Sequence, residues 1–187
     1  EVDLKTGKVL RARNLADTVF GEGAVAVGDV IVSLTWRRGV GLVHDIADFK
    51  PIRSFPIEGE GWGLTYDGEN LIMSDGTAQL RYLDPETFKV TKTLAVTVEE
   101  RPVDRLNELE WVEGEIYANV WQTDWIVRID PQSGAVIGLI DVSRLFPAEK
   151  RNEPYNDVPN GVAWDATSGK LYVTGKNWPK MFEIANP

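Results

Sequence analysis

The chain has 187 residues, 43% hydrophobic and 26% charged, which is enough for one well-packed domain. A net charge of −9 with no basic run makes nucleic acid and anionic membranes poor partners. There is no cysteine, which excludes disulfides, zinc–thiolate centres and cysteine nucleophiles, and no apolar run is long enough to span a membrane. The only histidine, His44, lies in the strand-like stretch GLVHDI, where we expect a structural role.

One turn pattern recurs along the chain. It appears in VDLKTGKVL, HDIADFKPIRSF, LDPETFKVTKTL and IDPQSGAVIGLI, whose aspartates, Asp3, Asp45, Asp84 and Asp130, are 42, 39 and 46 residues apart. Each copy predicts a strand, a turn rich in Asp, Pro, Gly or Thr, and a second strand. The C-terminal MFEIANP resembles the beginning of a fifth copy.

A second pattern lies between these copies. GDVIVSLTW, GENLIMSDG, GEIYANVW and GKLYVTGKNW each predict a tight glycine turn followed by a strand. Short strands precede them in GAVAV, WGLTY, LEWV and GVAW. Four strands in about 40 to 45 residues are the signature of a β-propeller blade, so the sequence predicts an all-β fold. Only SRLFPAEKR and RPVDRLN are expected to form short helices or loop insertions.

The strand count predicts about four blades in a single domain, residues 1–187. Three complete units follow the N-terminal residues, and the last unit has three strands, in GVAW, KLYVTG and MFEI. The N-terminal strand KVLRARNL could complete that unit, as ring closure in propellers commonly does.

A glutamate flanked by glycines occurs twice, as Glu22 in FGEGA and as Glu60 in EGEGWGL. Glycine lets other groups approach the backbone closely, so such a carboxylate is either a solvated turn residue or one aimed into a crowded cleft. The chain also has seven tryptophans, enough for a large core, a cleft lined with indoles, or both.

These motifs together resemble the glutaminyl-peptide cyclotransferase family of plant and bacterial type. The resemblance rests on FGEGA, GEGWGLTYDG, LIMSDGT, LRYLDP, RPVDRLNELEW, GEIYANVW, RIDP, NGVAWD and VTGKNWP, over nearly the whole chain. It implies a five-bladed β-propeller that converts an N-terminal glutamine to pyroglutamate with release of ammonia. Family members have a further N-terminal portion with a stretch like FTQGL, to which nothing here corresponds.

The resemblance also implies a set of site residues. Glu22 matches the catalytic glutamate, which would act first as base and then as acid. Lys176 matches a lysine that would stabilise the developing oxyanion, and Asn107 an asparagine that would orient the substrate. Walls for the substrate side chain are implied at Trp36, Trp62 and Trp121. For Glu60, a hydrogen bond to a neighbouring loop is expected rather than a role in proton transfer.

Further expectations follow from the family. Its substrates are peptides or proteins with an N-terminal glutamine, and its members are typically secreted or periplasmic. No cofactor and no catalytic metal are expected, although the channel could hold a structural calcium ion. The remaining four tryptophans are expected to be structural: Trp111, Trp125, Trp164 and Trp178.

Two other functions stay open at this point. Glu22, Asn107, Asp157 and Asn160 could form the oxygen-rich cluster of a calcium-dependent, lactonase-like propeller hydrolase. Alternatively, a propeller with fewer blades could be an inactive scaffold that binds peptide N-termini. The sequence leaves undecided whether four blades close a ring, exchange strands between chains or leave the ring open.

Overall fold

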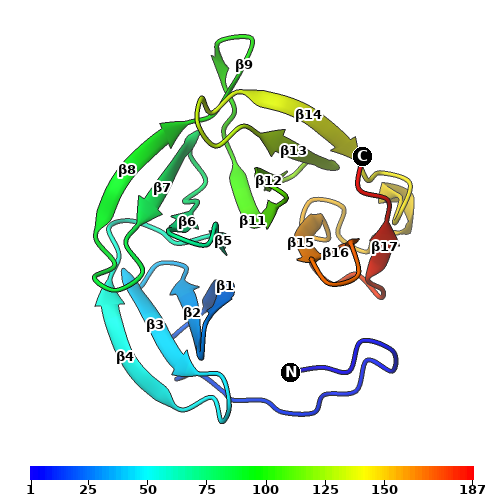
Figure 1. Cartoon of the computed structure of the whole chain (residues 1–187). Coiled ribbons are helices and arrows are strands. Elements are labelled where there is room, and N and C mark those ends of the chain that lie inside the picture. The colour runs from blue at the N-terminus through cyan, green and yellow to red at the C-terminus, as the bar shows by residue number, and fades with distance from the viewer.

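Four antiparallel sheets surround a central axis in the computed structural model, which describes residues 1–187 (Figure 1). Each sheet follows chain order outward from the axis. The first blade consists of β1 (Gly21–Val27), β2 (Val30–Thr35), β3 (Val40–Asp45) and β4 (Pro51–Pro56). The second consists of β5 (Leu64–Tyr66), β6 (Leu71–Met73), β7 (Gln79–Leu83) and β8 (Val90–Ala95).

The second half of the chain continues the arrangement. The third blade consists of β11 (Leu106–Val112), β12 (Glu115–Val120), β13 (Trp125–Ile129) and β14 (Val136–Asp141). The fourth has only three strands, β15 (Pro159–Asp165), β16 (Lys170–Gly175) and β17 (Phe182–Ile184). The predicted all-β propeller with four blades is therefore confirmed.

The only helical element is a 3₁₀ turn at Ala148–Lys150, inside the predicted insertion SRLFPAEKR. No helix of the chain is long and apolar enough to cross a membrane. The insertion expected at RPVDRLN is present, and it is not helical. There, β10 (Arg101–Pro102) pairs with β9 (Thr97–Val98) in a small hairpin that projects from the ring, and Leu106 already begins β11 (Figure 1).

The repeated aspartates close the turn between the third and fourth strands of a blade. Asp84 Oδ1 accepts hydrogen bonds from the backbone N–H groups of Glu86 and Thr87 and from the Thr87 hydroxyl. Asp130 makes the same three bonds, with Gln132 and Ser133. A short carboxylate that satisfies consecutive N–H groups fixes such a turn locally. This is why the pattern could be recognised from the sequence alone.

The hydrophobic core lies between the blades. Three clusters of buried side chains fill the spaces between the first and second, second and third, and third and fourth blades. The inner strands β1, β5, β11 and β15 pack one against the next around the axis. At Gly23 the strands are so close that an added Cβ would lie 2.6 Å from the backbone nitrogen of Leu64 and the carbonyl oxygen of Trp62. The inner strands therefore place their first residues close together.

The N-terminal strand does not complete the fourth blade in this structure. Residues 1–15 run through the sector between β15–β17 and the first blade (Figure 1). They fold back on themselves through a bridge between Val2 and Val9. Arg11 then attaches them to the first blade, because its guanidinium donates to the carbonyls of Ile46 and Ala47. The expectation of closure by this strand was thus wrong.

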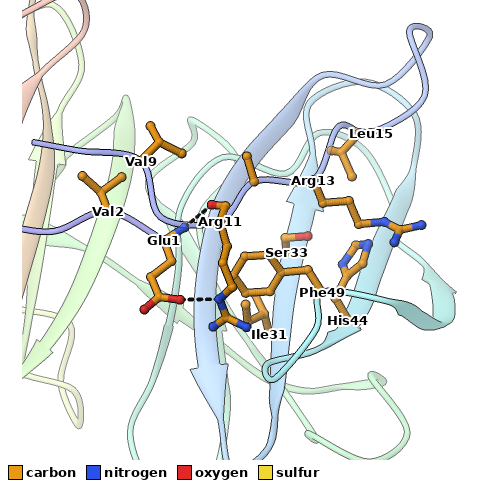
Figure 2. A pocket seen from close by; sticks show the side chains of 11 residues that line it. Glu1, Val2, Val9, Arg11, Arg13, Leu15, Ile31, Ser33, His44 and Phe49 are labelled. Carbon is orange, nitrogen blue, oxygen red and sulfur yellow. Dashed lines mark hydrogen bonds and ion pairs between the residues drawn. The ribbon is translucent and has the colours of Figure 1, made fainter.

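A cavity of about 480 Å³ lies under this N-terminal segment, against β2 and β3 (Figure 2). The side chains of His44, Ser33 and Phe49 point into it from the first blade, and Arg13 lies beside His44. Burial, and secondarily the charge of Arg13, lower the pKa of His44. No hydrogen bond joins His44 to Ser33, and the structural role of His44 stays a prediction.

Candidate active site

Three of the four inner strands begin with a β-bulge. The pairing register shifts between Gly21 and Ala24 in β1, between Leu106 and Leu109 in β11, and between Pro159 and Val162 in β15. A bulge inserts extra backbone and redirects side chains. In each bulge two residues oppose one on the partner strand, and the first of the two is Glu22, Asn107 or Asn160, so these three occupy equivalent positions.

A second equivalent position follows the second strand of a blade. Trp36, Trp121 and Lys176 come directly after β2, β12 and β16. Their backbone N–H groups donate to the carbonyls of Phe20, Arg105 and Val158, each two residues before the bulge residue of the same blade. The repeated blade geometry thus aligns these side chains with Glu22, Asn107 and Asn160 at one end of the ring.

The second blade supplies Trp62 from the motif Gly61-Trp62-Gly63, which parallels Gly21-Glu22-Gly23 in the first blade. Its indole covers Gly76, where an added Cβ would lie 2.6 Å from the ring. Gly76 also has a positive φ of 85°, which favours glycine. The absence of a side chain at position 76 therefore makes room for the Trp62 ring.

These side chains line one cavity of about 210 Å³. Trp62 and Trp121 meet edge to face with ring centroids 5.5 Å apart, and Phe20 meets Trp36 in the same way at 6.1 Å. The structure thus brings together every site residue implied by the resemblance, and adds Phe20. The complete lining is Phe20, Glu22, Trp36, Trp62, Asn107, Trp121 and Lys176.

The Glu22 carboxyl has a raised pKa. The main cause is burial among the aromatic rings, and the negative charge of Glu60 adds to it. The ammonium group of Lys176 acts in the opposite direction. A carboxyl group with a raised pKa that keeps a cation nearby is suited to take up and return a proton near neutral pH.

Glu108, which follows Asn107 in the β11 bulge, is a second acidic group near Glu22. Burial raises its pKa to about 7, and the charge of Glu22 is the next largest cause. Its carboxylate makes no side-chain hydrogen bond. Sequence reasoning missed this residue, although its place beside Asn107 in RLNELEW was the available signal. The negative charge of Glu22 therefore opposes the ionisation of Glu108.

Asn107 is buried and rigidly placed. Its backbone carbonyl accepts a hydrogen bond from the Ser74 hydroxyl, which itself accepts one from the N–H of Gly63. Its side-chain Oδ1 is buried and has no partner. A buried acceptor without a partner is costly. This oxygen is therefore available to a donor in the cavity, such as an amine.

Three of the four residues of the hydrolase alternative, Glu22, Asn107 and Asn160, occupy the same bulge position in three blades. Glu22 and Asn107 line the cavity, but Asp157 accepts hydrogen bonds from the side chain of Asn177 and the backbone N–H of Glu153. No group of three or more His, Cys, Asp or Glu side chains is placed to hold a metal ion. Asn107 and Asn160 each have a buried side-chain oxygen without a partner, so the calcium-dependent alternative stays open and is tested with EDTA.

The other four tryptophans lie outside the cavity. Trp178 is buried, packs against Phe146 and Phe182, and donates its indole N–H to the carbonyl of Asp157. Trp111 and Trp164 are half-buried beside the core clusters. Trp125 is 49% exposed on β13, so it contributes little to the core.

Comparison with known proteins agrees with this geometry. The family model described as glutamine cyclotransferase matches residues 1–185. The chain belongs to the glutamine cyclotransferase family. It is 41% identical, over 186 residues, to the glutaminyl-peptide cyclotransferase of Arabidopsis thaliana. The crystal structure of Myxococcus xanthus glutaminyl cyclase superposes with a TM-score of 0.84 at 36% identity and covers 90% of this chain.

The relatives are longer than this chain. The match covers 98% of this chain but 58% of the Arabidopsis protein, and 73% of the Myxococcus chain. A chain of the mitotic checkpoint complex also matches, with a TM-score of 0.56 at 12% identity over 92% of this chain and 49% of its own length. That likeness concerns the fold alone.

Proposed function

We propose that this chain cyclises the N-terminal glutamine of peptides and proteins to pyroglutamate and releases ammonia. The main observation behind the proposal is that Glu22, Asn107 and Lys176 line one small cavity together with three indole rings. Membership of the glutamine cyclotransferase family and the names of the two relatives support the same activity.

The cavity suits a glutamine side chain with its α-amine. Indole faces offer an apolar slot for the two methylenes, which bends the side chain so that the amine approaches the carboxamide carbon. The unpartnered Asn107 Oδ1 accepts one N–H of the α-amine and directs the nitrogen lone pair.

The chemical step then needs one proton to move twice. The Glu22 carboxylate removes a proton from the α-amine as its nitrogen attacks the carboxamide carbon, and a C–N bond forms. The carbonyl oxygen becomes an oxyanion, which the Lys176 ammonium stabilises. The Glu22 carboxylic acid returns the proton to the amide nitrogen, the second C–N bond breaks, and ammonia leaves. Glu22 ends as the carboxylate with which it began.

The deciding assay measures ammonia release from a Gln-initiated dipeptide, with and without EDTA, for the chain and for Glu22→Gln. We expect release that EDTA does not affect and that falls at least a hundredfold in the variant, because the amide cannot transfer the proton. Loss of activity in EDTA would contradict a metal-free mechanism and favour a calcium ion with a structural or catalytic role.

The scaffold alternative predicts a different result. A folded chain that is stabilised thermally by the peptide but releases no ammonia would be a binding protein and not an enzyme. The same peptide with an N-terminal asparagine is the matched control, since its shorter side chain cannot close the five-membered ring.

Action outside the cytoplasm, in a secreted or periplasmic setting, remains a prediction.

A further inference from the structure

Glu60 links two of the indoles that line the cavity. One oxygen of its carboxylate, Oε2, accepts the indole N–H of Trp36 at 2.8 Å and that of Trp62 at 2.9 Å. The two tryptophans belong to different blades, since Trp36 follows β2 and Trp62 precedes β5. Glu60 itself does not line the cavity. It therefore acts behind the two rings and joins them through a single atom.

Arg37 completes this arrangement on the solvent side. Its Nε donates to the other Glu60 oxygen, Oε1, at 3.0 Å, and its guanidinium lies 3.9 Å from the centre of the Trp36 ring. Trp36 is thus held at its N–H by the carboxylate and on one face by the cation. Few side-chain rotations of Trp36 are compatible with both contacts.

The glycines beside Glu60 explain how the carboxylate reaches this position. Gly59 has a φ of 77°, a conformation that L residues rarely adopt. At Gly61 an added Cβ would lie 2.9 Å from the Cβ of Leu34. Arg81 holds the same segment by donating to the carbonyls of Glu58 and Glu60. The turn is therefore shaped and fixed so that the Glu60 carboxylate reaches the indole N–H groups of Trp36 and Trp62.

We propose that Glu60 is a positioning residue for the cyclisation, which sets the spacing of the Trp36 and Trp62 rings and so the fit of the glutamine side chain. The proposal rests on the proposed function of the cavity. Glu60 contacts no reacting atom, and its effect on the substrate passes through the two indoles.

The charge of Glu60 has a second effect on the same site. Hydrogen bonds from Trp62, Arg37 and Trp36 lower its pKa, so it stays ionised. Its negative charge raises the pKa of Glu22. The other charged groups near Glu22 are Lys176, which lowers that pKa, and Glu108, whose own pKa the Glu22 charge raises. Removing the charge at position 60 therefore lowers the pKa of the catalytic carboxyl.

Two substitutions separate the effect of Glu60 on the placement of the two indole rings from the effect of its charge on Glu22. Glu60→Gln keeps an oxygen acceptor but loses the charge, whereas Glu60→Ala loses both. The control is Glu58→Ala, an acid on the same segment whose side chain makes no hydrogen bond or ion pair in the structure. Three readouts apply to each variant: the indole N–H signals in ¹H–¹⁵N spectra, the affinity for a Gln-initiated dipeptide by tryptophan fluorescence, and kcat and KM over pH.

We expect Glu60→Ala to shift the indole signals of Trp36 and Trp62, assigned with Trp36→Phe and Trp62→Phe, and to weaken affinity and raise KM about tenfold. Glu60→Gln should keep KM within about threefold and move the acid limb of the pH profile to lower pH. Glu58→Ala should change none of these.

The proposal is overturned if Glu60→Ala leaves KM and affinity at the level of Glu58→Ala in a folded protein. It is also overturned if the two indole signals do not move. An unmodified chain that binds the dipeptide but releases no ammonia counts against the proposed function instead. The indole signals and the dipeptide affinity then still decide whether Glu60 positions the rings.

Discussion

Glu108→Gln should stabilise the protein at alkaline pH and not at acid pH. The Glu108 carboxyl has a pKa of about 7 in the fold, because it is buried and faces the charge of Glu22, against 4.5 as its ordinary value. The folded protein therefore binds this proton more tightly than the unfolded chain. The stabilising contribution of the protonated group is fully present below about pH 4.5 and is lost as pH rises through about 7.

The size of the effect follows from the two pKa values. The difference between about 7 and 4.5, at about 1.4 kcal/mol per pH unit, corresponds to about 3 kcal/mol of unfolding free energy, lost by pH 8. Glutamine resembles the protonated acid in shape and cannot ionise. We therefore expect the stability of Glu108→Gln, relative to the unmodified chain, to increase by about 2 to 3 kcal/mol between pH 5 and pH 8.

Urea unfolding at pH 5, 6.5 and 8 measures this difference directly. The control is Glu69→Gln on the exposed β5–β6 turn, for which no comparable gain is expected. The gain should also shrink in a Glu22→Gln background, since the Glu22 charge is one of its causes. A pH-independent difference between Glu108→Gln and the unmodified chain would refute the reasoning and would mean that Glu108 is well solvated or ion-paired.

The remaining predictions concern the cavity and the packing of the inner strands. Lys176→Met removes the cation that lowers the pKa of Glu22, so the acid limb of the pH profile of kcat/KM should move to higher pH and kcat should fall about tenfold or more. The control Lys180→Met should change neither quantity. An acid limb that does not move in Lys176→Met would mean that Lys176 does not act on Glu22. Gly23→Ala places a Cβ against the backbone of the second blade. It should lower the free energy of unfolding, measured in urea, by about 1 to 3 kcal/mol and should also lower the activity. Gly138→Ala, whose Cβ would meet only the flexible Arg128 side chain, is its control, and equal stability of the two variants would contradict close packing of β1 on β5.

The candidate site was predicted from the family motifs, and the repeat of the blades explains why these residues lie together. Glu22 and Asn107 occupy the same bulge position, and Trp36, Trp121 and Lys176 the same position after a second strand. Strand and turn signals are local, and a repeat carries them from one blade to the next. Positions that looked unrelated along the chain are therefore equivalent in the fold, and the family motifs mark those positions.

Other features depended on contacts between blades. No local pattern indicates that Glu60 accepts hydrogen bonds from two indoles, since Trp36 lies 24 residues away. The raised pKa of Glu108 depends on its burial and on the charge of Glu22 from another strand. The N-terminal strand had the local character of a closing strand, but Arg11 attaches it to the first blade.

The amino-acid sequence by itself determined the strands, the aspartate turns and the number of blades, whereas the residues of the site were implied by the resemblance to the family. The strands, turns and blades depend on side chains within a few positions of one another, or on a repeat of that local pattern. The tertiary structure alone decided which carboxyl groups are buried together, which one holds the indoles and where the N-terminal segment lies. Burial and charge interactions are properties of the assembled ring, because they depend on distances between residues that are remote in the chain.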